Sequence, residues 1–580
     1  MYSKVLCYNE QKGSYILNLL SSGKNPEFFM HFKQEDNLLK NFYLKPKFFL
    51  VIKNYTAPQF VKDLTAGIIV AIIALPLSIA LALASGVEPA CGVYTAIAAG
   101  FIVSFLGGSR VQIAGPTAAF ATIVAGIVAS QGMDGLILAT IIAGILLILM
   151  GILKFGALIK YIPITITTGF TSGIAVTIFI GQIKDFLGLK YADGVKPIEA
   201  LDKLKANWDA ISTFSWQALL VGAVCLAILI IYPKFEKRVP PSLIAVIAGA
   251  LMVAFIPGLD DGVYTIGELY PIPSGLPHPT IGGIDFSFSK IAAVFSNAVT
   301  IAVLAAIESL LSCVVADKMI GSHHNSNAEL VAQGIGNIAS VCFGGIPATG
   351  AIARTAANIK NGGKTPVVGM VHAVILLLVL LFLMPLAELI PMPTIAAILF
   401  MVAYNMSEWR EFKHLIKTAP KSDITVLVTT FVLTVVFDLV AAIAAGMILT
   451  FVLFVKRSAS ETCVNMRSAD STKTDGLYMI DITGPLFFGA ADKLQSIKPE
   501  TDTKCIIINM AGVSSLDNTA MNALSSLYNT CSKENISIVI ADIRPQPLSV
   551  MKKCGFTDTL GSEHFCENSD SALALAETLV

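Results

Sequence analysis

The sequence QIAGPTAAF (Gln112 to Phe120) places Gly115, Pro116 and Thr117 inside a long run of apolar residues. A related phrase, GGIPATGAIA, follows at Gly344 to Ala353. Glycine and proline interrupt helices, and lipid offers no water to satisfy the backbone groups that an interruption frees. Such breaks are tolerated only where protein or a water-filled cavity surrounds them. The fold must therefore give both breaks a protected place.

A nearly constant spacing relates the regions around the two breaks. Three pairs of landmarks share it: Pro116 and Pro347 (231 residues apart), Pro76 and Glu308 (232), and Pro163 and Pro391 (228). This spacing predicts that the hydrophobic region consists of two related halves.

The composition is that of a membrane protein. Of the 580 residues, 14% are charged and the mean hydropathy is +0.73, whereas a soluble protein has about 25% charged residues. The formal net charge is zero and no long basic tract occurs, which argues against nucleic acid as a partner. The ten cysteines stand singly, without the spacing of a metal site or a disulfide framework.

Apolar windows of about 20 residues, the length that crosses a bilayer, predict fourteen spans, of which two are short. The first seven are 65–85, 89–106, 116–130, 134–153, 163–184, 216–232 and 240–256. The second seven are 291–315, 328–343, 348–359, 366–386, 393–405, 423–437 and 439–455. Twelve spans would remain if both short segments were re-entrant.

Seven spans are an odd number, so the second half must insert upside down relative to the first. Inverted repeats with broken helices at matching positions are typical of secondary transporters. Proline is tolerated in the first turn of a helix, so we expect Pro116 and Pro347 each to begin a half-helix near the membrane midplane. The N–H groups and dipoles of two such ends favour an anion. The alternative interpretation is a pair of ordinary proline kinks.

Small residues and two charges accompany the breaks. Gly115, Ala118, Ala348 and Gly350 would let backbone and ligand approach closely. Glu308 is the only ionisable side chain between Lys290 and Asp317, and an ionisable group deep in a span is functional by default. Arg354 follows Thr349 by about one and a half helical turns and would raise the positive potential. A structural alternative is an Arg354–Glu308 ion pair that holds two helices together.

The composition changes after Lys456 and Arg457 to that of a soluble domain. β-Branched runs such as CIIINMAGV alternate with segments of helical spacing, which predicts a small α/β domain over 475–580. Basic residues gather on alternate connections, so the positive-inside rule places the N-terminus and this domain in the cytosol. We expect residues 1–60 to be a cytosolic leader and residues 61–457 to form the transmembrane domain.

Long motifs in this chain resemble those of the sulfate permease (SulP) anion transporters with a C-terminal STAS domain. They are IALPLSIALALASGVEP, GGSRVQIAGPTAAF, GFTSGIAVTIFIGQIKDFLGL, AAIESLLSCVVADKM and NAELVAQGIGNIASVCFGGIPATGAIARTAANI. The resemblance runs from about Asp63 to the C-terminus. Through GPTAAF, FTSG, QIKDFLGL, AIARTAAN and MVAYNMSE the chain is especially similar to the bacterial C4-dicarboxylate transporters of the family.

The resemblance implies a core (about 63–155 and 289–388) that moves like an elevator past a gate (about 160–257 and 389–456), usually within a homodimer. It also implies a substrate pocket between the third and tenth spans. The residues expected at this pocket are Thr117, Ala118, Ala348, Thr349, Gly350 and Arg354 around the anion, with Leu77 and Leu81 along the wall.

The resemblance further implies a place for the co-ion. Sodium-coupled relatives have an acid at the place of Glu308 and a hydroxyl at the place of Ser312, and in proton-coupled relatives a carboxylate nearby carries the proton. We expect no other cofactor or metal. Many eukaryotic sulfate transporters have Pro-Gln where this chain has Pro76-Leu77, so the transfer of sulfate specificity is weakened.

The STAS domain contains SSLDNTAMNAL, where Thr519 matches a serine that is phosphorylated in soluble relatives. Asp517 or Asn518 at the start of a helix would serve equally well as a simple cap. A cytosolic protein is a further candidate partner of this domain.

Three other functions are alternatives to a transporter: an enzyme, an anion channel and a receptor. NGGKT (361–365) lacks the first glycine of a phosphate loop, because Asn358 stands there, so an ATPase or other enzyme is not expected. His323 and His324 are expected to be solvated loop residues rather than metal ligands. An uncoupled anion channel or a STAS-based receptor shares the architecture, but a channel has little need for Glu308.

The sequence therefore predicts secondary active transport of a small anion across the plasma (inner) membrane, with H⁺ or Na⁺ as co-ion. Sulfate, succinate or fumarate, and bicarbonate all fit a dipole-lined site, and anion exchange is an alternative to symport.

Overall fold

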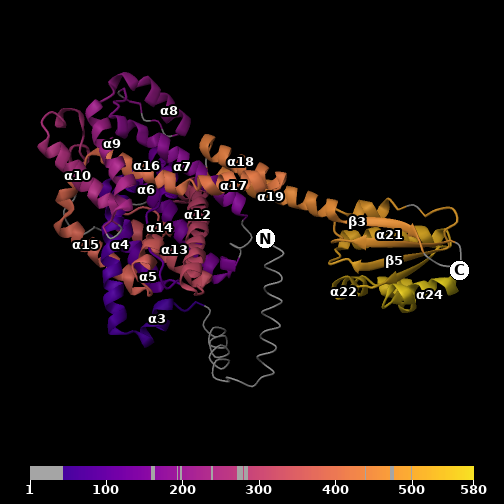
Figure 1. The fold of residues 1–580 in the computed structure, drawn as a ribbon. Coiled ribbons are helices and arrows are strands. Elements are labelled where there is room, and N and C mark those ends of the chain that lie inside the picture. The colour runs from indigo at the N-terminus through magenta and orange to yellow at the C-terminus, as the bar shows by residue number, and fades with distance from the viewer. Residues whose placement is uncertain are drawn as a thin grey trace. The chain divides into compact units, whose positions relative to one another are not determined.

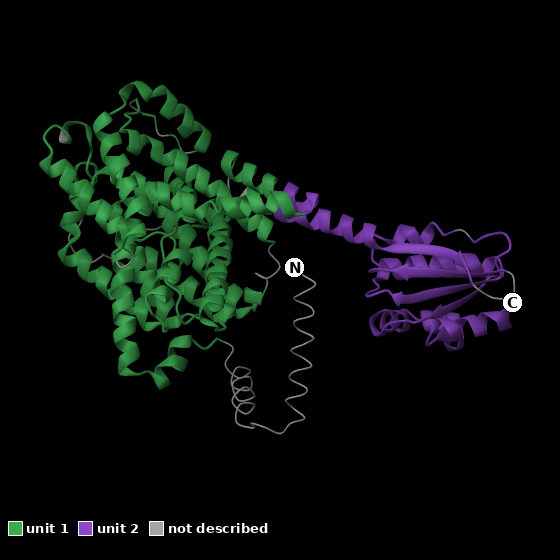
Figure 2. Cartoon of the chain, viewed as in Figure 1, with its two compact units in different colours: residues 1–419, 427–443 green, residues 420–426, 444–580 purple. Residues whose placement is uncertain are grey.

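The computed structural model describes residues 44–157, 163–192, 194–195, 197, 199–236, 239–270, 279, 285–437, 439–469, 476–497 and 499–580. Residues 1–43 of the expected leader lie outside these ranges. The chain forms two compact units, residues 1–419 with 427–443 and residues 420–426 with 444–580 (Figure 2).

The first unit is built almost entirely of helices (Figure 1). The first half contains α4 (Ala57–Ala84), α5 (Pro89–Leu106), α6 (Ala118–Ile152), α7 (Ile164–Leu187), α9 (Trp216–Ile231) and α10 (Pro241–Phe255). The second half contains α12 (Phe288–Ile320), α13 (Ser326–Cys342), α14 (Ile352–Lys360), α15 (Val367–Phe382), α16 (Met392–Met406), α18 (Lys421–Val436) and α19 (Leu439–Glu461), the last two of which extend into the second unit. Short helices precede or connect them: α3 (Lys47–Val51), α8 (Ala200–Asp209), α11 (Ile266–Leu269) and α17 (Trp409–Thr418).

Helix α6 contains two spans. Its 35 residues would extend about 52 Å at 1.5 Å per residue, whereas the hydrocarbon core of a bilayer is about 30 Å thick. Gly132 interrupts the helix with φ +72° and ψ −176°, a backbone conformation that is open to glycine and strained for other residues. The first half therefore has seven spans, and the seven helices of the second half match them.

Length and composition support a membrane-spanning unit. Seven of the described helices have the length and hydropathy that a span requires, and α10 and α15 are apolar but shorter. Helix α14 has only nine residues, about half of a span, as expected for a helix that starts at a break. The predicted arrangement of seven plus seven inverted spans is confirmed, and the predicted second span, 89–106, coincides with α5.

The helices of the first unit pack in two groups. Helix α6 packs against α12 and α13, and α5 packs against α4, α13 and α15. In the other group, α16 packs against α7 and α9, and α9 packs against α10. The first group carries both breaks.

The second unit contains a small α/β domain with the sheet order β3-β4-β5-β6-β7. The strands are β3 (Cys463–Ser468), β4 (Leu477–Thr483), β5 (Cys505–Gly512), β6 (Ser537–Ala541) and β7 (Phe565–Cys566). The helices are α20 (Ala491–Gln495), α21 (Asn518–Lys533), α22 (Pro545–Lys553), α23 (Phe556–Leu560) and α24 (Ser569–Leu579). Only β3 runs antiparallel to its neighbour; the other pairs are parallel.

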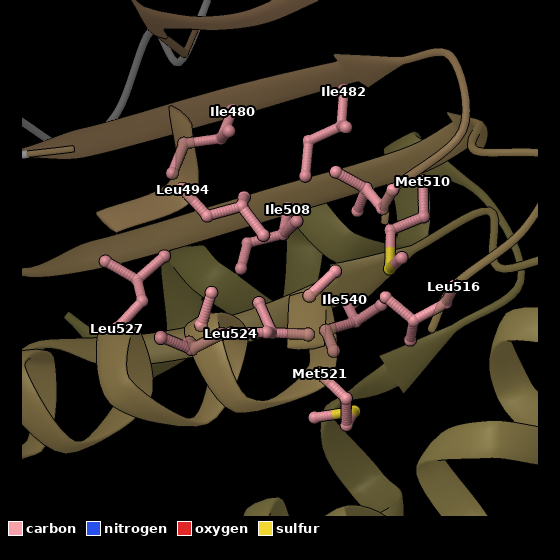
Figure 3. Packing of buried hydrophobic residues seen from close by; sticks show 14 of the residues in the cluster. Ile480, Ile482, Leu494, Ile508, Met510, Leu516, Met521, Leu524, Leu527 and Ile540 are labelled. Atoms are coloured by element: carbon pink, nitrogen blue, oxygen red, sulfur yellow. The ribbon is translucent and has the colours of Figure 1, made fainter. Parts of the chain in front are cut away.

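The apolar run of β5 follows from helices that cover both faces of this sheet. Ile506 and Ile508 point into a core with Leu524 of α21, as Figure 3 shows for Ile508 and Leu524, while Ile507 packs on the other face with Ala572 of α24. A parallel strand that is buried on both faces is apolar throughout.

Candidate functional site

The two breaks lie side by side. Residues Ala114–Gly115 form strand β1 and residues Thr349–Gly350 form strand β2, and the two strands pair antiparallel. Gly115 pairs with Thr349 and Ala114 with Gly350. The N–H of Ala351 also donates to the carbonyl of Ile113, at 2.9 Å. Each half of the chain therefore satisfies the backbone groups that the other half's break leaves free.

The prediction that each proline occupies the first turn of a half-helix is wrong in detail. Helix α6 begins at Ala118, two residues after Pro116, and α14 begins at Ile352, five residues after Pro347. Pro116 instead follows β1 and Pro347 precedes β2, so neither proline occupies a ladder position that needs its N–H. The breaks are thus extended segments that lead into helices, and ordinary proline kinks are excluded.

Both half-helices start without a side-chain cap. Thr117 is the residue before α6 and Ala351 the residue before α14, and neither caps its helix by a side-chain hydrogen bond. The first N–H groups of a helix then remain available for a ligand, and the helix dipole makes that ligand an anion. The two starts follow opposite ends of one two-residue strand pair.

Thr117 uses its hydroxyl to contact the predicted carboxylate. Its Oγ1 donates to Oε2 of Glu308 across 3.0 Å, and both side chains are half-buried. Ser309, the residue after Glu308, contacts the second break. Its hydroxyl lies 2.8 Å from Oγ1 of Thr349 and accepts a hydrogen bond from the N–H of Gly350 at 3.0 Å. Helix α12 therefore contacts both breaks within one turn.

Arg354 lies behind the first break. It is 3% exposed, and its Nη2 donates to the carbonyl of Pro116 (3.2 Å) and to the hydroxyl of Ser78 in α4 (3.3 Å). A Cβ at Gly115 would lie 2.4 Å from Nη1 of Arg354, so a larger residue there requires the guanidinium to shift. No ion pair joins Arg354 to Glu308 in the described part of the chain, so the structural alternative of such a pair is not realised.

Several predicted contact groups already have protein partners. The N–H and carbonyl of Ala348 each bond to the side chain of Asn337, at 2.8 Å. The hydroxyl of Ser312 faces Thr355 at 3.5 Å, and Thr355 accepts from the N–H of Ile113 at 3.0 Å. Ala348, Thr349 and Gly350 are thus held by protein partners, and Thr117 is half-buried just before the buried first residues of α6.

The two leucines of α4 differ in their surroundings. Leu77 is half-buried and packs against an apolar cluster that includes Ala218 of α9 and Ile398 of α16, whereas Leu81 is only 4% exposed. Leu77 therefore lies at the contact between the two helix groups. This contact is apolar.

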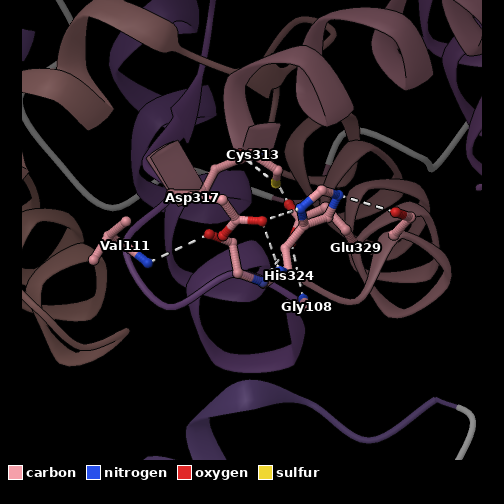
Figure 4. Close-up of polar contacts among 9 residues, drawn as sticks. Gly108, Val111, Cys313, Asp317, His324 and Glu329 are labelled. Atoms are coloured by element: carbon pink, nitrogen blue, oxygen red, sulfur yellow. Dashed lines mark hydrogen bonds and ion pairs between the residues drawn. The ribbon is translucent and has the colours of Figure 1, made fainter. Parts of the chain in front are cut away.

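A buried carboxylate that the sequence analysis did not select positions the chain ahead of the first break. Glu329 of α13 is fully buried and accepts from the N–H groups of Gly108 (2.9 Å) and Ser109 (3.1 Å) and from the amides of Gln112 (2.8 Å) and Gln333 (3.2 Å) (Figure 4). Four donors satisfy a buried carboxylate well. The sequence does contain a signal for this role, because Glu329 is an acid in an otherwise apolar span.

His324 lies in a loop, but the prediction that its side chain is solvated is wrong. Its Nδ1 lies 2.7 Å from Oδ2 of Asp317, its Nε2 lies 2.9 Å from the hydroxyl of Ser326, and its side chain is 9% exposed (Figure 4). Asp317 lies seven residues earlier, on the preceding helix. This separation is not a typical metal-ligand spacing, so the sequence did not indicate Asp317 as the partner of His324. His323 is exposed, as expected for a loop residue.

In the α/β domain, the cap interpretation is confirmed. Oδ1 of Asp517 accepts from the N–H of Ala520 at 2.8 Å, and Oδ2 accepts from the N–H of Phe488 at 2.9 Å. Thr519 is exposed in the first turn of α21.

Comparison with known proteins identifies the family of this chain. The sequence pattern described as the Sulfate permease family matches residues 60–430, and that of the STAS domain matches residues 468–572. "Putative sulfate transporter YvdB" of Bacillus subtilis is 40% identical over 89% of this chain and 98% of its own. Bicarbonate transporter BicA of Picosynechococcus is 31% identical over 74% of this chain and 79% of its own.

A solved structure shares the fold. The anion transporter Solute Carrier 26 family member A9 of the mouse, in its inward-facing state, superposes with a TM-score of 0.82 over 96% of both chains, at 17% identity. The family pattern covers most of the chain, including both breaks and Glu308. The chain is a multi-pass membrane protein and an anion transporter, not an enzyme, and it belongs to the sulfate permease family with a C-terminal STAS domain.

Proposed function

We propose that this protein is a secondary active transporter that moves a small anion together with a proton or Na⁺. The pairing of Gly115 with Thr349 carries the proposal, because it brings two uncapped helix starts to one place beside a carboxylate. Helix N-termini attract anions, and the buried guanidinium of Arg354 adds positive potential behind the first break.

Glu308 supplies the coupling. An ionised carboxylate that bonds to Thr117, at the start of α6, repels an anion at the same helix start, by an energy of order a few kcal/mol at short separation. A proton or a cation on Glu308 removes this repulsion. Binding of co-ion and anion then become mutually favourable, and by linkage each raises the affinity of the other.

The residues around Glu308 fit either co-ion. Na⁺ is a hard cation that prefers oxygen ligands, and Glu308, Thr117 and nearby carbonyls are all oxygen donors. Ser312, the predicted second ligand, would have to turn away from Thr355 to take part. A proton needs only the half-buried carboxylate itself, so we favour H⁺ as the simpler co-ion.

The movement would be an elevator-like displacement of the core (about 63–155 and 289–388) along the gate (about 160–257 and 389–456). The apolar contact of Leu77 with α9 and α16 supports it, because apolar surfaces slide without breaking directional bonds. We further propose a homodimer in the plasma membrane, with the N-terminus and the STAS domain in the cytosol. There the STAS domain would offer its surface to a protein partner.

Relatives narrow the substrate class without deciding it. Two of them are called sulfate and bicarbonate transporters, and the resemblance of GPTAAF, FTSG, QIKDFLGL, AIARTAAN and MVAYNMSE to motifs of C4-dicarboxylate transporters adds a third candidate. The family resemblance puts Leu77 on the pocket wall, and an apolar wall there would favour a substrate with a carbon chain, such as succinate or fumarate, over sulfate. We therefore propose a C4-dicarboxylate as first candidate and sulfate or bicarbonate as alternatives.

Uptake into proteoliposomes tests the proposal. Labelled succinate, sulfate and bicarbonate are compared side by side, each with an inward proton gradient, an inward Na⁺ gradient or neither, and with unlabelled competitors. Saturable uptake that one cation gradient accelerates supports coupled transport. Uptake that ignores both gradients but needs a counter-anion inside would show an exchanger, and non-saturating flux would show a channel.

A further inference from the structure

Helix α17 is amphipathic and basic. At 100° per residue its apolar side chains fall on one arc and its cations on the adjoining arc. The apolar residues are Trp409, Phe412, Leu415 and Ile416, and the cations are Arg410, Lys413 and Lys417. None of the ten residues is fully buried.

The protein covers only part of the apolar arc. The ring of Phe412 packs at 5.3 Å from that of Phe431 in α18, whereas Trp409 is 45% and Ile416 is 42% exposed. The three cations are exposed, and the guanidinium of Arg410 lies 5.5 Å from the Trp409 ring. Glu411 is the one acid within the helix, so the net charge of α17 is +2 with His414 neutral.

Helix α8 occupies the equivalent place in the first half, between the fifth and sixth spans. Seven spans separate α8 from α17, an odd number, so the two helices lie at opposite faces of the membrane. Helix α8 also exposes apolar side chains, with Leu201 at 50%, Leu204 at 48% and Trp208 at 78%. Its two lysines are balanced by two aspartates, so its net charge is zero. The inverted repeat thus presents one basic and one neutral interfacial helix.

We propose that α17 binds the headgroups of anionic phospholipids in the leaflet on its side of the membrane, and that α8 binds its leaflet without headgroup preference. An amphipathic helix with exposed tryptophan lies in the headgroup region with its apolar face inserted. Each lysine or arginine beside an anionic surface strengthens binding about fivefold at moderate salt. Because α17 connects α16 to α18 and packs against α7, bound lipid fixes these helices relative to the membrane surface.

The tryptophans of the chain provide the test. There are three in the sequence, Trp208 in α8, Trp216 in α9 and Trp409 in α17. Full-length protein with Trp208→Phe and Trp216→Phe reports on α17, and protein with Trp216→Phe and Trp409→Phe reports on α8. Each is placed in mixed phosphatidylglycerol and phosphatidylcholine vesicles in which one lipid or the other carries brominated chains, and fluorescence quenching is measured.

We expect brominated phosphatidylglycerol to quench Trp409 at a several-fold lower mole fraction than brominated phosphatidylcholine. High salt, or the combined change Arg410→Gln, Lys413→Gln and Lys417→Gln, should remove this preference. Trp208 should be quenched equally by both lipids. If the triple variant fails to assemble, Lys417→Gln alone should remove part of the preference, and the matched change Lys205→Gln in α8 should leave the quenching of Trp208 unaltered.

Equal quenching of Trp409 by the two lipids would overturn the proposal. So would a preference that survives the charge-neutralising changes, or a Trp409 that neither brominated lipid reaches. The test does not depend on transport, so its failure would leave the proposed function untouched.

Discussion

The hydroxyl of Thr117 donates to the carboxylate of Glu308 across 3.0 Å and joins the start of α6 to the middle of α12. Thr117 belongs to the first half of the chain and Glu308 to the second. An anion held at the helix start and a proton or cation held at the carboxylate would therefore lie beside the same hydrogen bond. The predictions below follow from this arrangement.

Replacing Glu308 with glutamine should uncouple transport. The amide cannot take up a proton or attract a cation, so we expect uptake driven by a proton or Na⁺ gradient to fall at least tenfold, while anion exchange at equal concentrations persists. Uptake with and without each gradient measures the effect. A matched control is Glu88→Gln, at the exposed start of α5. A Glu308→Gln protein that still follows the gradient would refute the role of Glu308.

Replacing Thr117 with valine should weaken the co-ion's effect on anion affinity. The change keeps the shape of the side chain but removes the hydroxyl that is expected to contact the anion, and a hydrogen bond to a charged group contributes about 1.5–3 kcal/mol. We expect the KM for the anion to rise about tenfold or more and its dependence on the co-ion to shrink. Thr117→Ser keeps the hydroxyl and should restore both values. If serine and valine behave alike, the hydroxyl does not matter.

Arg354 should be irreplaceable by lysine. Nη2 of the guanidinium donates to Ser78 and Pro116 while Nη1 lies beside Gly115, and an ammonium on a flexible stem does not reproduce this planar group. We expect Arg354→Gln to abolish uptake and Arg354→Lys to raise KM at least tenfold. Arg110→Gln, at an exposed position, serves as the control for loss of one positive charge. Normal transport by Arg354→Lys would show that charge alone is sufficient.

A methyl group at Gly115 should disturb the site, whereas one at Gly126 should not. The Cβ of alanine at position 115 would lie 2.4 Å from Nη1 of Arg354, while at Gly126 nothing lies within 4 Å. Overpacking of this kind costs about 1–3 kcal/mol. We expect Gly115→Ala to lower kcat/KM at least fivefold and Gly126→Ala to leave it unchanged, as measured by initial uptake rates. Equal rates for the two variants would contradict the tight packing.

The STAS domain should lose stability in acid through Asp481. Partial burial acts to raise the pKa of this carboxyl, but the hydrogen bonds from Arg467 (2.7 Å) and Asn509 (2.8 Å) outweigh it and hold the pKa below its ordinary value. A pKa that is lower in the folded state stabilises the fold above the unfolded value of about 3.9. This stabilisation is lost as the pH falls through the folded pKa.

Replacing Arg467, the ion-pair partner of Asp481, measures what this carboxylate contributes to the stability of the domain. Arg467→Gln should lower the free energy of unfolding of the domain by at most about 1 kcal/mol at pH 6, because both side chains are partly exposed. The difference should vanish once the pH falls below the lowered folded pKa, where Asp481 is protonated with or without Arg467. Hydrogen exchange of the β3 and β4 amides in the full chain gives the measurement, with Lys504→Gln as a surface control. A difference that is constant with pH would exclude this ion pair as its cause.

Much of the fold could be predicted because spans are long and apolar. The predicted spans 216–232 and 240–256 agree closely with α9 and α10, since about 20 apolar residues leave little choice of structure. The constant spacing between the halves predicted the inverted repeat. Hydropathy alone could not show that the third and fourth spans join in one helix with a break at Gly132.

The details of the site were less predictable because they depend on contacts across the fold. Strands of two residues, such as β1 and β2, leave no periodic pattern, and their pairing joins residues more than 230 positions apart. The roles of Asn337, Ser309 and Glu329 depend on which backbone groups the fold brings to them. Glu308 and Arg354 were predicted because a charge in an apolar segment is conspicuous on its own.

The pairing of β1 with β2 also has a consequence for biosynthesis. Gly350 is made 236 residues after Ala114, its partner in the pair. Until the ribosome has delivered that later segment, the backbone around Ala114 has no strand to bond with, and lipid cannot replace it. The nascent first half must therefore keep residues 113–117 in a hydrated or chaperoned environment, and a chain truncated before Gly350 should be recognised by membrane quality control as incomplete.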